Sequence, residues 1–238
     1  MIGLYGIGGS GKTTLAKEVG KKVEELKLFE KVVMTSVSQT LNVRSIQAQM
    51  ADKLGVHFQE ESDEGRAQRL SQRLKNVATL IILDDVWQKL NFEEIGIPIH
   101  GNKGCRVLLT TRNKEVCTLM QCQSIIGLDL LTSGEAWSLF KIHAKINDES
   151  PYALKVVARK IVDECKGLPI AIVTVGSSLW DKSFDEWELA LSKLEDSKPL
   201  DIPPGLTKDY EIHLEDLFRF GKGLRLIGTF GTMEIARK

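Results

Sequence analysis

The chain has few cysteines, and they lack the spacing of a metal site or a redox pair. They stand at Cys105, Cys117, Cys122 and Cys165. No two of them form a C-x-x-C pair, and no histidine lies at metal-ligand spacing from them. Disulfide frameworks belong to oxidising compartments and mostly to shorter chains. We therefore expect reduced thiols in a cytoplasmic protein, and neither a zinc site nor a secreted disulfide scaffold.

Long apolar runs are also missing. The longest run of mainly apolar residues, 168–175, is far shorter than the roughly 20 residues that cross a bilayer. The N-terminus shows no basic segment followed by an apolar one, so we expect no signal peptide. These absences predict a protein with no membrane span.

The chain carries no excess of either charge. Lysine plus arginine and aspartate plus glutamate each total 32, so the formal net charge is zero. Proteins that bind nucleic acids or membrane surfaces electrostatically usually carry a basic excess. The composition, 42% hydrophobic and 27% charged, is that of a globular protein. We therefore expect no nucleic-acid partner, and one large domain or two small ones over the 238 residues.

The strongest motif in the sequence is GIGGSGKTT, residues 6–14. It fits the phosphate-binding pattern G-x-x-x-x-G-K-[ST], in which glycines let main-chain N–H groups approach phosphate oxygens. The glycines of this loop are Gly6, Gly8, Gly9 and Gly11. Lys12 is expected to reach the β- and γ-phosphates, and the Thr13 hydroxyl is expected to bind Mg²⁺. The motif predicts that the chain binds a nucleoside triphosphate.

Short apolar runs alternate with helical patterns over the first half of the chain. Buried parallel strands are expected to be apolar throughout, as residues 80–83 are. We expect strands at residues 2–5, 31–38, 79–86, 106–111 and 124–131. Strands separated by helices predict right-handed crossovers and one parallel sheet. The sequence therefore predicts an α/β P-loop nucleotide-binding domain over residues 1–131.

Helical stripes lie between these expected strands. The first follows the phosphate loop directly, and its apolar residues are Leu15, Val19, Val23 and Leu26. A second stripe over residues 43–54 has Asn42 as its N-cap and Gly55 as its stop, and a third covers residues 67–74.

The second half of the chain has only helical patterns up to residue 196. Two capping boxes, Thr132 with Glu135 and Ser183 with Glu186, mark helix starts. We expect a small all-α subdomain over residues 132–196. Its one ambiguous segment is 169–175, which is β-branched and favours a strand by propensity, although Pro169 also suits the first position of a helix. Prolines and a glycine then indicate a linker at Pro199, Pro203, Pro204 and Gly205.

Two acids close the apolar strand at residues 79–86, which is the Walker B arrangement. The carboxyl ends of parallel strands face the crevice where ligands bind. Asp84 is expected to hold Mg²⁺, directly or through water, and Asp85 to orient or activate the attacking water. Arg112 ends the next strand at the same edge and can hydrogen-bond a γ-phosphate. The alternatives, a simple strand cap and a solvated arginine, stay open, and Trp87 is interpreted as a packing residue like Trp137.

Five motifs together carry a family resemblance. They are GIGGSGKTT, LIILDDVW, CRVLLTTRN, LDLLTSGEAWSLF and CKGLPIAIVTVG, in this order over residues 2–194. The chain resembles the NB-ARC domain of plant intracellular immune receptors of the nucleotide-binding, leucine-rich-repeat class. Trp87, which comes after the two aspartates, is similar to the coiled-coil subclass.

The resemblance implies both roles and a mechanism. It implies phosphate and Mg²⁺ contacts from Lys12, Thr13 and Thr14, a sensor role for Arg112, and packing of Pro169 near the adenine. It also implies that residues 169–175 are helical. For the whole domain it implies a switch, off with ADP and on with ATP, with oligomerisation after exchange and slow ATP hydrolysis.

The chain departs from the family pattern at both ends. It starts one short strand before the phosphate loop, and we expect a truncated form that lacks the family's signalling domain and leucine-rich repeats. Residues 209–238 resemble part of a winged-helix subdomain, so we expect a linker and partial remnant over 197–238. Three functions stay open: a switch module that associates with itself or with other receptor domains, a turnover ATPase, and a non-signalling remnant or decoy.

Overall fold

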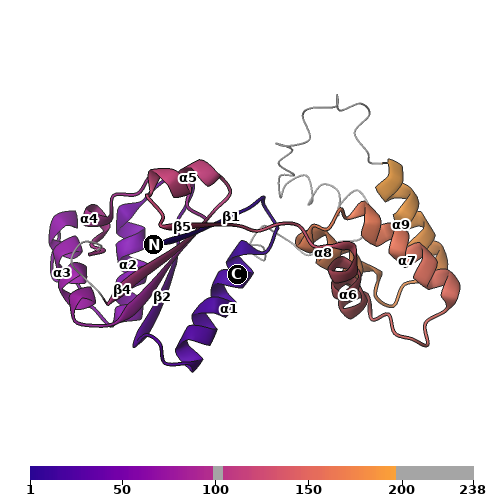
Figure 1. Cartoon of the computed structure of the whole chain (residues 1–238), viewed down its shortest axis with the longest axis horizontal. Helices are drawn as coiled ribbons and strands as arrows, with labels where there is room; N and C mark the ends of the chain where they lie inside the picture. Colours follow the sequence, from indigo (N-terminus) through magenta and orange to yellow (C-terminus); the bar gives the residue numbers. More distant parts are fainter. Residues whose placement is uncertain (99–103, 197–238) are drawn as a thin grey trace. The chain divides into compact units, whose positions relative to one another are not determined.

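The computed structural model describes residues 1–98 and 104–196, which form two compact units (Figure 1). The first unit contains Met1–Ile7 and Gly11–Leu128, and the second contains Gly8–Ser10 and the described residues from Asp129 onward. The linker and remnant expected over 197–238 lie outside the described residues. Within those described ranges, no helix is both long enough and apolar enough to cross a membrane.

The first unit is built on a parallel sheet of five strands in the order β2-β3-β4-β1-β5. The strands are β1 (Ile2–Tyr5), β2 (Lys31–Ser36), β3 (Thr79–Asp84), β4 (Cys105–Thr111) and β5 (Ser124–Gly127). Every residue of β3 is buried, as expected for a central parallel strand. The fold prediction is confirmed. Strand β1 leads into the phosphate loop and β3 ends in Asp84, and only β4 lies between these two strands.

Three expected strands are shorter in the structure, and one of them, expected at 79–86, ends at Asp84. The strand expected at 31–38 ends at Ser36, where its pairing with β3 stops at Asp84. The strand expected at 124–131 ends at Gly127, because its only partner in the described sheet is the four-residue β1. Strands β2 and β5 each end where the pairing with the neighbouring strand ends, which local sequence does not specify.

Helices pack on both faces of this sheet. They are α1 (Lys12–Glu25), α2 (Val43–Leu54), α3 (Asp63–Lys75), α4 (Phe92–Ile95) and α5 (Lys114–Leu119). The main core contains residues of α2, α3, α4 and α5, whereas a smaller cluster beneath α1 covers the other face. The predicted signals of α2 are confirmed: the Asn42 side chain accepts a hydrogen bond from the N–H of Ser45, and Gly55 ends the helix at φ 67°.

The buried face of α1 differs from the expected one. Leu15 and Val19 are 41% and 37% exposed, while the residues that face the sheet include the small Ala16 and Gly20. A Cβ at Gly20 would lie only 3.0 Å from Cδ1 of Ile82. The helix therefore lies so close to the sheet that small side chains fit between them at Ala16 and Gly20. Of the expected apolar stripe, only Val23 packs against the cluster beneath α1.

The second unit is helical, with α6 (Ser133–Ala144), α7 (Tyr152–Glu164), α8 (Pro169–Leu179) and α9 (Phe184–Asp196). Its core is centred on Phe140, which stacks with Trp137 at 6.4 Å between ring centroids and meets Trp187 edge-on at 6.0 Å. The packing interpretation of Trp137 is therefore confirmed. Both predicted capping boxes form, at Thr132 with Glu135 and at Ser183 with Glu186.

Residues 169–175 are helical, so the strand that propensity favoured is wrong. Pro169 occupies the first turn of α8, where its missing N–H costs nothing. The face formed by Ile172, Val175 and Leu179 is buried in the second-unit core. A Cβ at Gly176 would stand 3.2 Å from Cβ of His143 on α6. Burial of this face against α6 outweighs the modest β-propensity of the segment.

The capping box of α6 predicts a pH-dependent contribution to stability. Hydrogen bonds from the Thr132 hydroxyl and N–H lower the pKa of Glu135. A lowered folded-state pKa gives stability that is present above the unfolded-state pKa and is lost as the pH falls through the folded value. We expect Glu135→Gln, which keeps the geometry, to lower the urea midpoint at about pH 7 and to match the unmodified chain near about pH 3. Glu188→Gln on exposed α9 surface is the control, and a pH-independent loss in Glu135→Gln would contradict the assignment.

Candidate functional site

The loop between β1 and α1 has the backbone that its glycines predict. Gly11 is the N-cap of α1 and adopts φ 96°, a left-handed conformation that favours glycine. No heavy atom lies within 4 Å of the place where a Cβ would stand at Gly11. The start of a helix carries main-chain N–H groups without an intrahelical partner, which is the feature that an anion site uses.

Lys12 is held inside this loop. Its side chain is only 7% exposed, and Nζ donates to the carbonyl oxygens of Gly6 and Ile7, at 2.7 Å each. The N–H of Gly6 in turn donates to the carbonyl of Thr111 at the end of β4, at 3.3 Å. The lysine ammonium is thus held just beyond the carboxyl end of β1, by the first residues of the loop.

Thr13 and Asp84, the two residues predicted to hold Mg²⁺, are in contact. The Thr13 hydroxyl lies 2.9 Å and 3.0 Å from the two carboxylate oxygens of Asp84. The Thr110 hydroxyl, from neighbouring β4, donates to Oδ1 of Asp84 at 2.7 Å. Asp84 is only 7% exposed, and these two hydroxyls supply the hydrogen bonds that its buried carboxylate needs. The structure brings together two residues 71 positions apart in the sequence.

Asp85 and Arg112 form a second pair at the same edge. Asp85 adopts φ 59°, and its N–H donates to the Thr110 hydroxyl at 2.9 Å. Nε of Arg112 lies 3.5 Å from Oδ1 of Asp85, and Nε1 of Trp87 donates to Oδ2 at 3.2 Å. The guanidinium carbon of Arg112 lies 4.8 Å from the centroid of the Trp87 ring. Both carboxylate oxygens of Asp85 are therefore engaged by neighbouring side chains.

Pro169 belongs to the second unit, together with the loop residues Gly8–Ser10. Next to it, the N–H of Ile170 donates to the carbonyl of Gly9 at 3.3 Å. Gly9 adopts φ 78°, and a Cβ there would overlap the Ile170 side chain, so both conformation and space require glycine. A contact of Pro169 with adenine stays a prediction.

The donor set fits a nucleotide phosphate with Mg²⁺. The Ser10 hydroxyl, also in the loop, is buried and makes no hydrogen bond with any described residue, which marks it as a donor available to a ligand. No group of three or more His, Cys, Asp or Glu side chains among the described residues could hold a metal by itself. Mg²⁺ is commonly bound by one or two carboxylates together with substrate phosphates. Asp84 and the Thr13 hydroxyl match that pattern.

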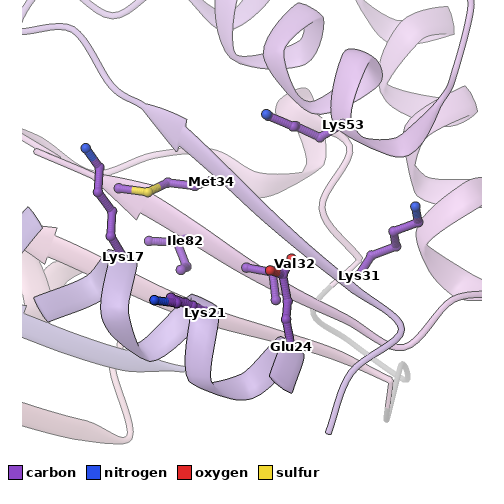
Figure 2. Close-up of a pocket in the computed structure, with 9 residues that line it drawn as sticks. Lys17, Lys21, Glu24, Lys31, Val32, Met34, Lys53 and Ile82 are labelled. Carbon is purple, nitrogen blue, oxygen red and sulfur yellow. The ribbon is translucent and has the colours of Figure 1, made fainter. Parts of the chain in front are cut away.

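A separate cavity of about 410 Å³ opens between α1 and edge strand β2 (Figure 2). Its apolar floor includes Val32, Met34 and Ile82. Four lysines from three elements surround it, namely Lys17, Lys21, Lys31 and Lys53. None of the predicted site residues lines it. Lysine stems cover apolar surface while their ammonium groups stay in water, which accounts for this arrangement where one helix covers the edge of a sheet.

Residues 1–150 match the family described as the NB-ARC domain. The chain belongs to the NB-ARC family. This NB-ARC chain is 38% identical over 205 residues to Disease resistance protein At4g27190 of Arabidopsis thaliana, covering 83% of this chain and 21% of that protein. It is 32% identical over 204 residues to Disease resistance protein RPS5 of the same plant, covering 83% and 23%. The chain thus spans less than a quarter of the length of either relative, and the resemblance inferred from its motifs is confirmed.

Solved structures with the same fold include a signal-transduction ATPase and an ORC2 protein. The NB-ARC chain superposes with a TM-score of 0.51 and 19% identity on a Signal Transduction ATPase with Numerous Domains from Pyrococcus horikoshii, over 81% of this chain and 30% of that one. It superposes with a TM-score of 0.52 and 17% identity on the Aeropyrum pernix ORC2 protein, over 94% and 79%. At these identities the comparison establishes the P-loop ATPase fold alone.

Sequence reasoning missed two contributors to this NB-ARC site. The Thr110 hydroxyl forms hydrogen bonds with the Asp84 carboxylate and with the N–H of Asp85. Trp87 contacts both Asp85 and Arg112. A threonine at the end of a strand next to two acids was the available signal for Thr110. For Trp87 the signal was its position two residues beyond Asp85, which the packing interpretation did not use.

Proposed function

We propose that this chain is the nucleotide-binding switch module of a plant disease resistance protein and binds ADP and ATP with Mg²⁺. The observation that carries the proposal is the contact of Thr13 with Asp84, because it joins the phosphate loop to the acid of β3. The disease resistance relatives support the immune role.

The loop binds the phosphates in this proposal. Main-chain N–H groups near Gly11 and the buried Ser10 hydroxyl donate to phosphate oxygens. Lys12 exchanges its bonds to the loop carbonyls for the β- and γ-phosphates. Thr13 and Asp84 hold Mg²⁺, which neutralises phosphate charge when bound.

Arg112 distinguishes ATP from ADP by binding the γ-phosphate. Moving a conformation from rare to dominant requires differential binding of about 5.5 kcal/mol. A charge-assisted hydrogen bond contributes roughly 1.5–3 kcal/mol, so the γ-phosphate contacts of Lys12 and Arg112 supply much of that difference. The ADP-bound form is off and the ATP-bound form is on.

Slow hydrolysis is part of the same proposal. Asp85 is the residue placed to orient or activate water, and both its carboxylate oxygens already have partners in Arg112 and Trp87. A carboxylate engaged in this way accepts a proton from water less readily. This favours a switch with slow turnover over an ATPase whose hydrolysis does mechanical work.

Identification of the bound nucleotide tests the proposal. The chain is purified, denatured and the released nucleotide is identified, and steady-state ATP turnover is measured on the native protein. Retained ADP with slow turnover supports the switch. Fast turnover that Lys12→Ala abolishes supports a turnover ATPase. A protein that neither retains nucleotide through purification nor binds added nucleotide measurably supports a non-signalling remnant.

The setting of the module follows from the same proposal. We place it in the cytoplasm, associating with itself or with other receptor domains after ATP replaces ADP. Light scattering after size exclusion, with ADP and with ATP, measures that association. An identical mass in both nucleotides would remove self-association from the proposal.

A further inference from the structure

Trp87 differs from the core tryptophans of this chain. Trp137 and Trp187 pack in the hydrophobic core of the second unit. Trp87 is partly exposed and belongs to none of the hydrophobic clusters formed by the described residues. Its packing interpretation therefore lacks the contacts that a packing role requires.

The contacts of Trp87 are polar and electrostatic. Its indole Nε1 donates to Oδ2 of Asp85 at 3.2 Å, and its ring lies 4.8 Å from the guanidinium carbon of Arg112. The same Asp85 lies 3.5 Å from Nε of Arg112 through its other oxygen. Indole is the aromatic ring with the strongest attraction for a cation, so Trp87 restrains the guanidinium by its face while orienting its ion-pair partner.

These contacts leave part of the guanidinium available. The closest contact with Asp85 uses Nε. Within residues 1–98 and 104–196, no hydrogen bond involves the two terminal Nη groups of Arg112. Asp85 contacts Nε of the planar guanidinium and Trp87 contacts its face. The two Nη groups therefore stay available as parallel donors for bidentate binding of a phosphate.

We propose that Trp87 is a positioning residue for Arg112, holding the guanidinium beside Asp85 so that its Nη donors meet the terminal phosphate of ATP. This inference rests on the proposed function. Trp87 thereby increases selectivity for the triphosphate over the diphosphate, since ADP lacks the group that Arg112 binds. Trp87, two residues beyond Asp85, is therefore part of the nucleotide discrimination of this chain, although it acts on the nucleotide only through Arg112.

Two substitutions separate the roles of the ring and of its N–H. Trp87→Leu removes both, whereas Trp87→Phe keeps an aromatic face without the donor. Dissociation constants for Mg-ATP and Mg-ADP are measured by titration calorimetry, with thermal unfolding as a check of the fold. We expect Trp87→Leu to weaken ATP binding by about 3- to 10-fold, Trp87→Phe to be intermediate, and ADP binding to change by less than about 2-fold.

A double-mutant cycle with Arg112→Ala decides whether Trp87 acts through the arginine. We expect Trp87→Leu to have no further effect on ATP binding once Arg112 is alanine. Equal weakening of ATP and ADP, or an undiminished effect in the Arg112→Ala background, would overturn the positioning role. Failure of the unmodified chain to bind either nucleotide would instead overturn the proposed function, so the two failures are distinguishable.

Discussion

Replacing Lys12 with alanine is expected to weaken ATP binding by about 100-fold or more. The lysine is the first residue of α1, and its side chain bonds to two carbonyl oxygens of the loop. Loss of charge-assisted bonds to two phosphates costs roughly 3 kcal/mol or more, which corresponds to that factor. Titration calorimetry with Mg-ATP measures the change.

Lys17→Ala is the matched control for this variant. Lys17 lies on the same helix but lines the separate cavity beside β2 (Figure 2). We expect its removal to leave the dissociation constant within about 2-fold, because a solvated charge outside the loop is screened by salt. Equal losses in the two variants would show that general positive charge on α1, and not the loop lysine, attracts the nucleotide.

Asp84→Asn is expected to remove most of the Mg²⁺ dependence of ATP binding. The asparagine keeps the shape of the side chain, and the hydroxyls of Thr13 and Thr110 can rotate to pair with its amide. What is lost is the charge that favours a divalent cation. We expect ATP affinity in Mg²⁺ to fall by about 10- to 100-fold, and affinity in a chelator to stay unchanged.

Asp52→Asn, on the exposed surface of α2, controls for the loss of one negative charge. It is expected to keep the full response to Mg²⁺. If Asp84→Asn retained the same ratio of affinities with and without Mg²⁺, the metal role of Asp84 would be wrong, and the residue would act only as a hydrogen-bond acceptor between the loop and β4.

Local patterns predicted most of the fold. The apolar strand that ends in Asp84 is fully buried, as its composition requires, and the caps at Asn42 and Thr132 form with the hydrogen bonds expected of them. These features depend on a few adjacent residues, which is why one sequence suffices to find them.

What the sequence did not reveal depends on partners distant in the chain. The face that α1 buries is selected by the close approach of Gly20 to Ile82. Packing on α6 decides the helical state of residues 169–175, for which local propensity favoured a strand and only the family resemblance implied the helix that the structure confirms. The contact of Thr13 with Asp84 could be anticipated because both motifs end at one edge of a parallel sheet. The role of Trp87 could not, because it requires knowing that Arg112 lies over its ring.

The left-handed backbone at Asp85 limits how this position can vary in sequence. At φ 59° an aspartate, an asparagine or a glycine is accommodated readily, whereas a β-branched residue is strained. A single change from acid to amide would therefore alter the chemistry of the position while leaving the turn intact. If Asp85 activates water as proposed, Asp85→Asn would remove that activity while keeping the left-handed turn.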